Sequence, residues 1–291
     1  SVSAFLLNRS SDLLVLLQIS PDKFEQPVIP DLDANERKTM LILLTDWHIG
    51  AAWDNHFGVF NYEIATARIQ TLLDEIQKLQ IIYSCEAAVV MCLGDMINGA
   101  IRRTVQLQNR ETVIEQTKNA AELLTNFCYT LCKLFSVVTL TGCAGNHSRL
   151  VENKESAVKD DRLDSIITWA ASKSLQHILN FNYVDAIDTT LTSVNIYDHE
   201  FIGVHGDYDK FSRNGIHSII TALHRFPYAV CFGLMHSPAL QEADGVLLLR
   251  GGSLCGTGDD YTISRRITGQ PSQTVCIVSQ RGVESIHPIP L

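Results

Sequence analysis

The chain has 291 residues, of which 46% are hydrophobic and 19% are charged, and its formal net charge is −9. This composition is that of an ordinary folded globular protein and excludes an intrinsically disordered chain. The acidic balance counts against broad, nonspecific binding of nucleic acids, because such binding depends on lysine and arginine neutralising phosphates. A local basic cleft or a metal-neutralised site remains compatible with it.

Membrane spans and disulfides are not expected either. No apolar run reaches the roughly 20 residues that a membrane span needs. The apolar run at residues 12–19 is short, and it lacks the basic flank and cleavage site of a signal peptide. We therefore expect a cytoplasmic protein that does not bind membranes. The eight cysteines include no C-x-x-C pair, and most lie in apolar runs, which predicts reduced thiols packed in the core.

Residues 1–38 differ from the rest of the chain. A short strand or hairpin is predicted around 13–19, and it is followed by Pro21, Pro27 and Pro30 and then by a charged stretch. Clustered prolines and charges are typical of a linker. We expect residues 1–38 to form an N-terminal extension and residues 39–291 to form one domain.

From residue 39 onward the pattern alternates between strands and helices. Continuous apolar runs predict buried strands over 40–44, 87–93 and 135–140. Apolar residues at helical spacing predict helices over 61–80, about 105–134 and 161–179. Beyond residue 182 we expect one amphipathic helix at about 211–225 and short strands around 190–197, 200–204, 228–232, 246–250, 273–279 and 282–288. This order predicts an α/β core whose second half adds another sheet.

Asp, His and Asn side chains, which can bind metal ions, follow five of the predicted strands. These strand ends carry Asp46-Trp47-His48, Gly94-Asp95, Gly145-Asn146-His147, His205 and His236. In α/β sheets, ligand sites form beyond the carboxyl ends of the strands, and glycine there lets the backbone approach a ligand closely. Each motif alone is weak evidence for a site. Together, carboxylates, imidazoles and an amide oxygen at one edge suit a pair of divalent cations such as manganese, iron or zinc.

This ordered set resembles the calcineurin-like metallophosphoesterase superfamily. The signature of that family is Asp-x-His, Gly-Asp, Gly-Asn-His, a lone His and Gly-His-x-His, and the resemblance covers roughly residues 39–250. It implies an α/β fold, a four-layer αββα sandwich of two mixed β-sheets flanked by helices. It also implies a centre of two divalent ions, where a metal-activated hydroxide hydrolyses phosphomonoesters or phosphodiesters.

The resemblance assigns a role to each matching position. By position it places Asp46, His48 and His236 on the first metal, Asp95 between both metals, and Asn146 and His205 on the second. His147 matches the catalytic histidine of the family, which acts from outside the metal shell. Manganese is the expected ion, with iron, zinc or magnesium as alternatives.

One position departs from the family pattern. Gly233-Leu234-Met235-His236 aligns with Gly-His-x-His, so Leu234 stands where a ligand of the second metal is expected. Because leucine cannot coordinate a metal, the second site is predicted to be weak, and activity is expected to need high metal concentrations.

Three arginines near the motifs are candidates for binding substrate phosphate, because arginine makes bidentate contacts to phosphate. Arg149 lies two residues after His147, and Arg102 and Arg103 follow the Gly-Asp motif. For Arg102 and Arg103, a solvated position on a loop or helix is an equally good interpretation.

The substrate is less well specified than the reaction. The motif Asp-x-His-Ile-Gly looks most like the DNA-repair exonuclease branch of the family and its phage-encoded relatives. The later stretches 250–261 and 270–273 resemble phage metallophosphoesterases. The leading hypothesis is therefore a metal-dependent phosphodiesterase, a nuclease that acts on DNA. Assembly into a homo-oligomer is left open. A phosphomonoesterase or small-nucleotide hydrolase is one alternative. A non-catalytic binding or scaffolding protein, favoured by Leu234, is the other.

Overall fold

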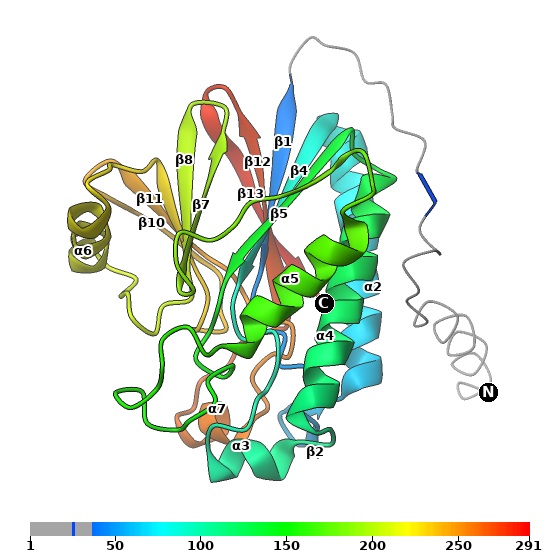
Figure 1. The fold of residues 1–291 in the computed structure, drawn as a ribbon, viewed down its shortest axis with the longest axis vertical. Helices are drawn as coiled ribbons and strands as arrows, with labels where there is room; N and C mark the ends of the chain where they lie inside the picture. The colour runs from blue at the N-terminus through cyan, green and yellow to red at the C-terminus, as the bar shows by residue number, and fades with distance from the viewer. Residues whose placement is uncertain (1–24, 27–36) are drawn as a thin grey trace.

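A computed structural model describes residues 25–26 and 37–291 of the chain (Figure 1). The strand predicted around 13–19 lies outside the described residues. The first sheet has the strand order β13-β12-β1-β4-β5-β6. Its strands are β1 (Lys38–Leu44), β4 (Cys85–Leu93), β5 (Val137–Cys143), β6 (Phe181–Tyr183), β12 (Ser272–Ser279) and β13 (Gly282–Pro290). β1, β4, β5 and β6 are parallel, whereas β12 is antiparallel to β1, so the sheet is mixed.

The second sheet has the order β10-β11-β9-β8-β7 and is also mixed. Its strands are β7 (Leu191–Ile196), β8 (His199–Val204), β9 (Ala229–Phe232), β10 (Ala239–Ala243) and β11 (Val246–Arg250). A separate hairpin joins β2 (Trp53–Asn55) to β3 (Gly58–Phe60). The strands predicted at 273–279 and 282–288 belong to the first sheet and not to the second, because β12 pairs with β1.

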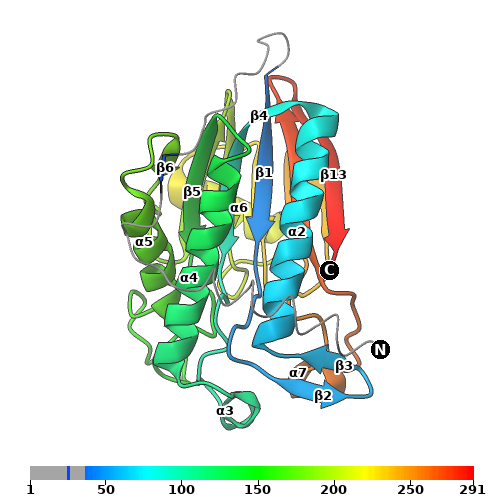
Figure 2. The ribbon, with the colours of Figure 1, turned by 90° about the vertical axis from the view of Figure 1, so that its right-hand side faces the viewer.

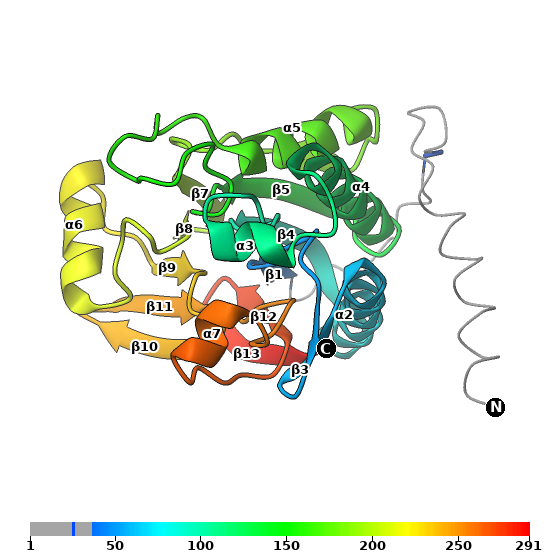
Figure 3. The ribbon, with the colours of Figure 1, turned by 90° about the horizontal axis from the view of Figure 1, so that it is seen from below.

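Helices cover both outer faces of the paired sheets (Figures 1 and 3). The first sheet is covered by α2 (Tyr62–Tyr83), α4 (Val113–Cys132) and α5 (Leu163–Leu175), and the second by α6 (Arg213–Leu223). The four-layer αββα sandwich implied by the family resemblance is therefore confirmed. Two short helices, α3 (Arg103–Gln108) and α7 (Asp260–Ser264), lie at one end of the layers.

The side chains of the central strand β1 pack into two cores, one on each face of the sheet. Met40, Ile42 and Leu44 face the helices, whereas Leu41 and Leu43 face the second sheet. Alternate side chains of a strand point to opposite faces, so a strand buried on both sides needs a continuous apolar run. A third core lies between the second sheet and α6.

The helix predicted over about 105–134 is divided into α3 and α4. Asn109 at the end of α3 has an extended backbone, and a new helix begins after Thr112. The Thr112 side chain accepts a hydrogen bond from the N–H of Glu115, whose carboxylate accepts one from the N–H of Thr112. This capping box satisfies N–H groups that a helix start leaves unpaired, and it therefore favours a new start over a continuous helix.

Both sheets direct their parallel strands toward the same end of the molecule. Figure 2 shows β1 running toward the end where α3, α7 and the β2–β3 hairpin lie. The loops that follow β1, β4 and β5 in the first sheet and β8 and β9 in the second all emerge there, and these loops carry the five motifs. None of the helices in the described part of the chain combines the length and the hydropathy that crossing a membrane requires.

Candidate metal centre

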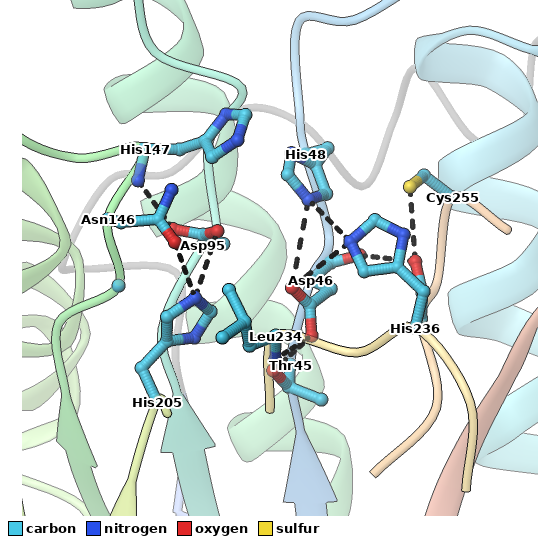
Figure 4. Close-up of polar contacts among 12 residues, drawn as sticks. Thr45, Asp46, His48, Asp95, Asn146, His147, His205, Leu234, His236 and Cys255 are labelled. Carbon is cyan, nitrogen blue, oxygen red and sulfur yellow. Dashed lines mark hydrogen bonds and ion pairs between the residues drawn. The ribbon is translucent and has the colours of Figure 1, made fainter. Parts of the chain in front are cut away.

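The five strand-end loops bring the predicted ligand side chains into one buried cluster (Figure 4). One half of the cluster contains Asp46, His48 and His236, which lie on loops from both sheets. His48 Nε2 is 3.3 Å from His236 Nε2, and Asp46 Oδ1 lies 3.8 Å and 3.4 Å from these two nitrogens. Oδ1 is fully buried and accepts no hydrogen bond from the described residues. A buried carboxylate oxygen without a donor is costly unless a cation contacts it.

The other half contains Asp95, Asn146 and His205. His205 Nε2 lies 3.1 Å from Asp95 Oδ2 and 3.2 Å from Asn146 Oδ1. Ligand atoms of Asp46, Asp95 and His205 all lie within 4.8 Å of one another, so Asp46 and Asp95 stand between the two halves. The buried carboxylates and imidazoles of the cluster could hold a metal ion.

The three candidate ligand histidines share one orientation. Each has its Nδ1 next to an oxygen: Asn98 Oδ1 at 3.2 Å for His48, the Gly256 carbonyl at 3.1 Å for His236, and the Leu93 carbonyl at 2.7 Å for His205. An Nδ1–H that donates to such an oxygen fixes the tautomer in which Nε2 carries the lone pair. All three Nε2 atoms point into the cluster, which is how metal-binding histidines are held in proteins.

The electrostatics of the cluster favour positive charge between the carboxylates. Burial alone would raise the pKa of Asp46, but His236 and His48 hold that pKa well below its usual range. Burial alone would lower the pKa of His205, but Asp95 raises it to about 10. Ionised carboxylates that favour a proton on the imidazoles around them also favour a divalent cation in the same place.

His147 lies beside the cluster without joining it. Its ring stands edge-on to that of His48, with the centroids 4.6 Å apart. Its Nδ1 is 2.7 Å from the Asn98 carbonyl, and its backbone N–H donates to Asp95 Oδ1 at 2.7 Å. Burial lowers the pKa of His147 to about 4. A neutral His147 donating through Nδ1 leaves Nε2 as the atom that can exchange a proton with a ligand.

Five residues of the motif loops have a strained backbone. Positive φ angles occur at Asp46 (52°), His48 (48°), Asp95 (53°), Leu234 (70°) and His236 (54°). Side-chain-bearing residues in this left-handed region cost about 1–2 kcal/mol each. Such strain persists where the surrounding structure fixes it, and it clusters at functional sites.

Asp164 is a residue that the sequence did not single out. Its buried carboxylate accepts hydrogen bonds from the N–H groups of Asp95 (2.9 Å), Met96 (3.2 Å) and Gly145 (2.9 Å). It thereby fastens the second motif loop to the third. The two loops touch so closely that a Cβ on Gly145 would lie 2.2 Å from Asp95 Oδ1. Asp164 sits on α5, outside every motif, so no local signal marked it.

Cys255 is the second residue that was missed. All eight cysteines are buried and free, as predicted, but Cys255 both packs in the core that faces the helices and borders the cluster. Ligand atoms of His48, His236 and Cys255 lie within 4.8 Å of one another. The sequence did contain a signal for Cys255, because this residue follows strand β11 in a loop that contains Gly251. Since β11 is parallel to β9, the loops after both strands emerge at the same edge of the sheet.

Leu234 occupies the space between the two halves (Figure 4). Its backbone N–H donates to Asp46 Oδ2 at 3.0 Å, and Thr45 Oγ1 donates to the same oxygen at 2.7 Å. Leu234 therefore places an apolar side chain beside His205 and Asp46, and the weak second site stays a prediction.

The three candidate arginines differ in burial. Arg102 and Arg103 are exposed at the start of α3. Arg149 is only 6% exposed, and its buried Nε donates no hydrogen bond to the described residues. Burial and the nearby Arg162 lower the pKa of Arg149. A buried guanidinium with an unused donor suits an anionic ligand, which favours Arg149 among the three.

No family model and no curated protein matches the chain. Solved structures that resemble it include an archaeal phosphodiesterase, at 15% identity and a TM-score of 0.42, covering 87% of this chain and 99% of that one. Another is a Zn²⁺ complex of Vps29 from Entamoeba histolytica, at 11% identity and a TM-score of 0.40, covering 87% and 98%. A third is a predicted phosphoesterase from Streptococcus pneumoniae TIGR4, at 11% identity and a TM-score of 0.34, covering 88% and 100%.

All three TM-scores lie below 0.5. The fold is therefore assigned from the layers and the strand order of this chain. At the level of the fold, the resemblance to the calcineurin-like metallophosphoesterases is confirmed. The four layers are those that the family implies, and each motif lies at the predicted strand end. Membership of the DNA-repair branch stays a prediction.

Proposed function

We propose that this protein is a metal-dependent phosphoesterase. One observation carries the proposal: three histidines direct their Nε2 atoms toward two buried carboxylates while their Nδ1 atoms face fixed oxygens. Asp46, His48 and His236 would hold one divalent ion, and Asn146 and His205 the second, with Asp95 between them. Oδ1 of Asp46, which is buried and accepts no hydrogen bond from the described residues, fits this donor set.

A divalent ion supplies Lewis-acid polarisation of phosphoryl oxygens and lowers the pKa of water that it binds. The residues of the chain supply orientation and proton transfer. His147 Nε2 would exchange a proton with the substrate, because Nδ1 faces the Asn98 carbonyl. Arg149 would neutralise part of the phosphate charge.

The finer proposal is a phosphodiesterase with DNA as its substrate and manganese as its ion. Its support is the Asp-x-His-Ile-Gly motif at Asp46–Gly50 and the arginines Arg102, Arg103 and Arg149 near the motif loops. Cytoplasmic location and assembly into a homo-oligomer also remain predictions.

The test compares hydrolysis of bis(p-nitrophenyl) phosphate with that of p-nitrophenyl phosphate during titrations of Mn²⁺ and Zn²⁺. The His147→Ala variant is expected to lose about 10²- to 10⁴-fold in rate, while His217→Ala on α6 serves as a matched control. Faster cleavage of the diester, followed by cleavage of single- or double-stranded DNA, would support the finer proposal. Preference for the monoester would replace it with a phosphomonoesterase.

A second candidate function is a non-catalytic binding or scaffolding protein, and Leu234 is the observation that favours it. An apolar side chain in the second half removes a ligand that hydrolysis by two ions would use. If the metal-loaded protein hydrolyses neither substrate and His147→Ala changes nothing, the scaffold becomes the better proposal.

A further inference from the structure

We propose that the thiol of Cys255 is a fourth protein ligand of the first metal position. The donor set would then be one carboxylate, two imidazoles and one thiolate, from Asp46, His48, His236 and Cys255. The inference rests on the proposed function only in taking this cluster as a metal centre. It adds a ligand outside the five motifs and changes which ion the site selects.

The spacing of the donor atoms is that of one small ion. Bonds of about 2.0–2.1 Å at a tetrahedral ion separate two ligand nitrogens by about 3.3 Å. His48 Nε2 and His236 Nε2 are 3.3 Å apart, and Asp46 Oδ1 lies 3.4 Å from the latter. A sulfur on the same ion would lie about 3.6 Å from each nitrogen, and the Cys255 sulfur lies within 4.8 Å of one ring nitrogen of His48 and one of His236.

A separate observation distinguishes this cluster from a cysteine packed beside histidines. Asp46 Oδ1, which is buried between the two imidazoles, has no hydrogen-bond donor among the described residues. The other carboxylate oxygen, Oδ2, accepts two hydrogen bonds, from Thr45 and Leu234. The carboxylate is thus held through Oδ2, and its Oδ1 faces the Nε2 atoms of His236 and His48 at 3.4 Å and 3.8 Å, as a metal ligand does.

The loop that carries Cys255 is fastened to the loop that carries Asp46. The Leu254 N–H donates to the Asp46 carbonyl at 3.1 Å, and Ser253 Oγ donates to the same carbonyl at 3.1 Å. Ser253 Oγ also lies 3.1 Å from the Cys255 sulfur. Arg68 on α2 donates to the Leu254 carbonyl at 2.7 Å. The thiol is therefore positioned by hydrogen bonds and beside a cation that offsets anionic ligands.

A thiolate ligand changes the expected metal. Sulfur and imidazole donors favour zinc, iron and cobalt, whereas manganese and magnesium favour all-oxygen surroundings. The first position should therefore bind Zn²⁺ or Co²⁺ tightly and discriminate against Mn²⁺. The second position, which lacks a histidine at Leu234, should remain weak for every ion.

The test uses the full chain freed of metal by a chelator and titrated with Co²⁺. We expect an intense sulfur-to-cobalt charge-transfer absorption in the near ultraviolet that saturates at the first equivalent. Cys255→Ser should abolish this band, keep the weaker visible bands of cobalt, and weaken Zn²⁺ binding at least about 10-fold. Cys132→Ala on α4 is the matched control and should retain the band.

X-ray absorption of the zinc-loaded wild type tests the same point without a variant, and it should show one sulfur at about 2.3 Å. Scattering from nitrogen and oxygen alone, or a charge-transfer band that survives Cys255→Ser, would overturn the inference. These readouts do not depend on catalysis. A hydrolytically active protein without a sulfur ligand would defeat this inference alone, and an inactive protein with one would defeat only the proposed function.

Discussion

The backbone N–H of Leu234 donates a 3.0 Å hydrogen bond to Oδ2 of Asp46. The loop after β9 therefore orients a carboxylate of the proposed first metal position, although the Leu234 side chain cannot bind a metal at the proposed second position. Leu234 has φ of 70°, so the backbone conformation at this position is an unusual one that the loop maintains. Backbone and side chain at this position have separable roles.

Replacing Leu234 by histidine should create a stronger second metal position. The new imidazole would lie in the same space as the leucine side chain, next to His205 and Asp46, where it adds a nitrogen ligand. We expect a second ion per chain, measured by metal analysis after gel filtration, together with faster phosphoester hydrolysis at low metal concentration. Met235→His, at the exposed neighbouring residue, is the control. Equal metal content in the two variants would contradict the prediction.

Removal of the Asp164 carboxylate should destabilise the protein as well as the site. Asp164→Ala would leave three buried N–H groups, on Asp95, Met96 and Gly145, without their acceptor. Each unsatisfied buried donor costs about 1–3 kcal/mol, so we expect the free energy of unfolding in urea to fall by about 3 kcal/mol or more. Asp161→Ala, at an exposed position, should change it by less than about 0.5 kcal/mol. A similar loss in both variants would show that Asp164 does not anchor the loops.

Arg149 should affect substrate binding more than metal binding. Arg149→Met removes a buried guanidinium whose Nε donor is unused by the described residues. A charge-assisted hydrogen bond contributes about 1.5–3 kcal/mol, so KM for a phosphoester should rise about 10- to 100-fold while metal content stays constant. Arg103→Met, at an exposed residue of α3, should change KM much less. An unchanged KM for Arg149→Met would remove Arg149 from the phosphate site.

Glu284 on β13 provides a pH dependence that is independent of the metal centre. Hydrogen bonds from Ser279, Lys38 and Arg281 lower the pKa of Glu284 from 4.5 to about 2. A depressed folded-state pKa stabilises the protein fully above the unfolded value of 4.5, and this contribution disappears as the pH falls toward 2.

Glu284→Gln should therefore reduce the free energy of unfolding at pH 7 by about 1 kcal/mol, the range of partly exposed ion pairs. The difference between variant and wild type should shrink steadily in urea titrations below pH 4.5. Glu63→Gln, at an exposed residue of α2, is the control. A difference that grows on acidification would have the wrong sign for this ion pair.

The sequence by itself determined most of the elements and the positions of the motifs. The continuous apolar run of β1 required burial on both faces, and the helical periodicity of residues 61–80 matches α2 (Tyr62–Tyr83). These signals are local, because strand and helix geometry repeat over two and about 3.6 residues. The same locality placed Asp46, Asp95 and His205 at strand ends, and parallel strands bring such ends to one edge.

Only the tertiary structure decided which distant segments meet. The pairing of β12 with β1 joins residues more than 200 positions apart in the chain, and no local pattern specifies such a partner. Asp164 and Cys255 reach the cluster for the same reason: one comes from a helix and one from a loop outside the motifs. Their contacts depend on how sheets and helices pack over long sequence separations, so the periodicity that identifies an element carries no information about them.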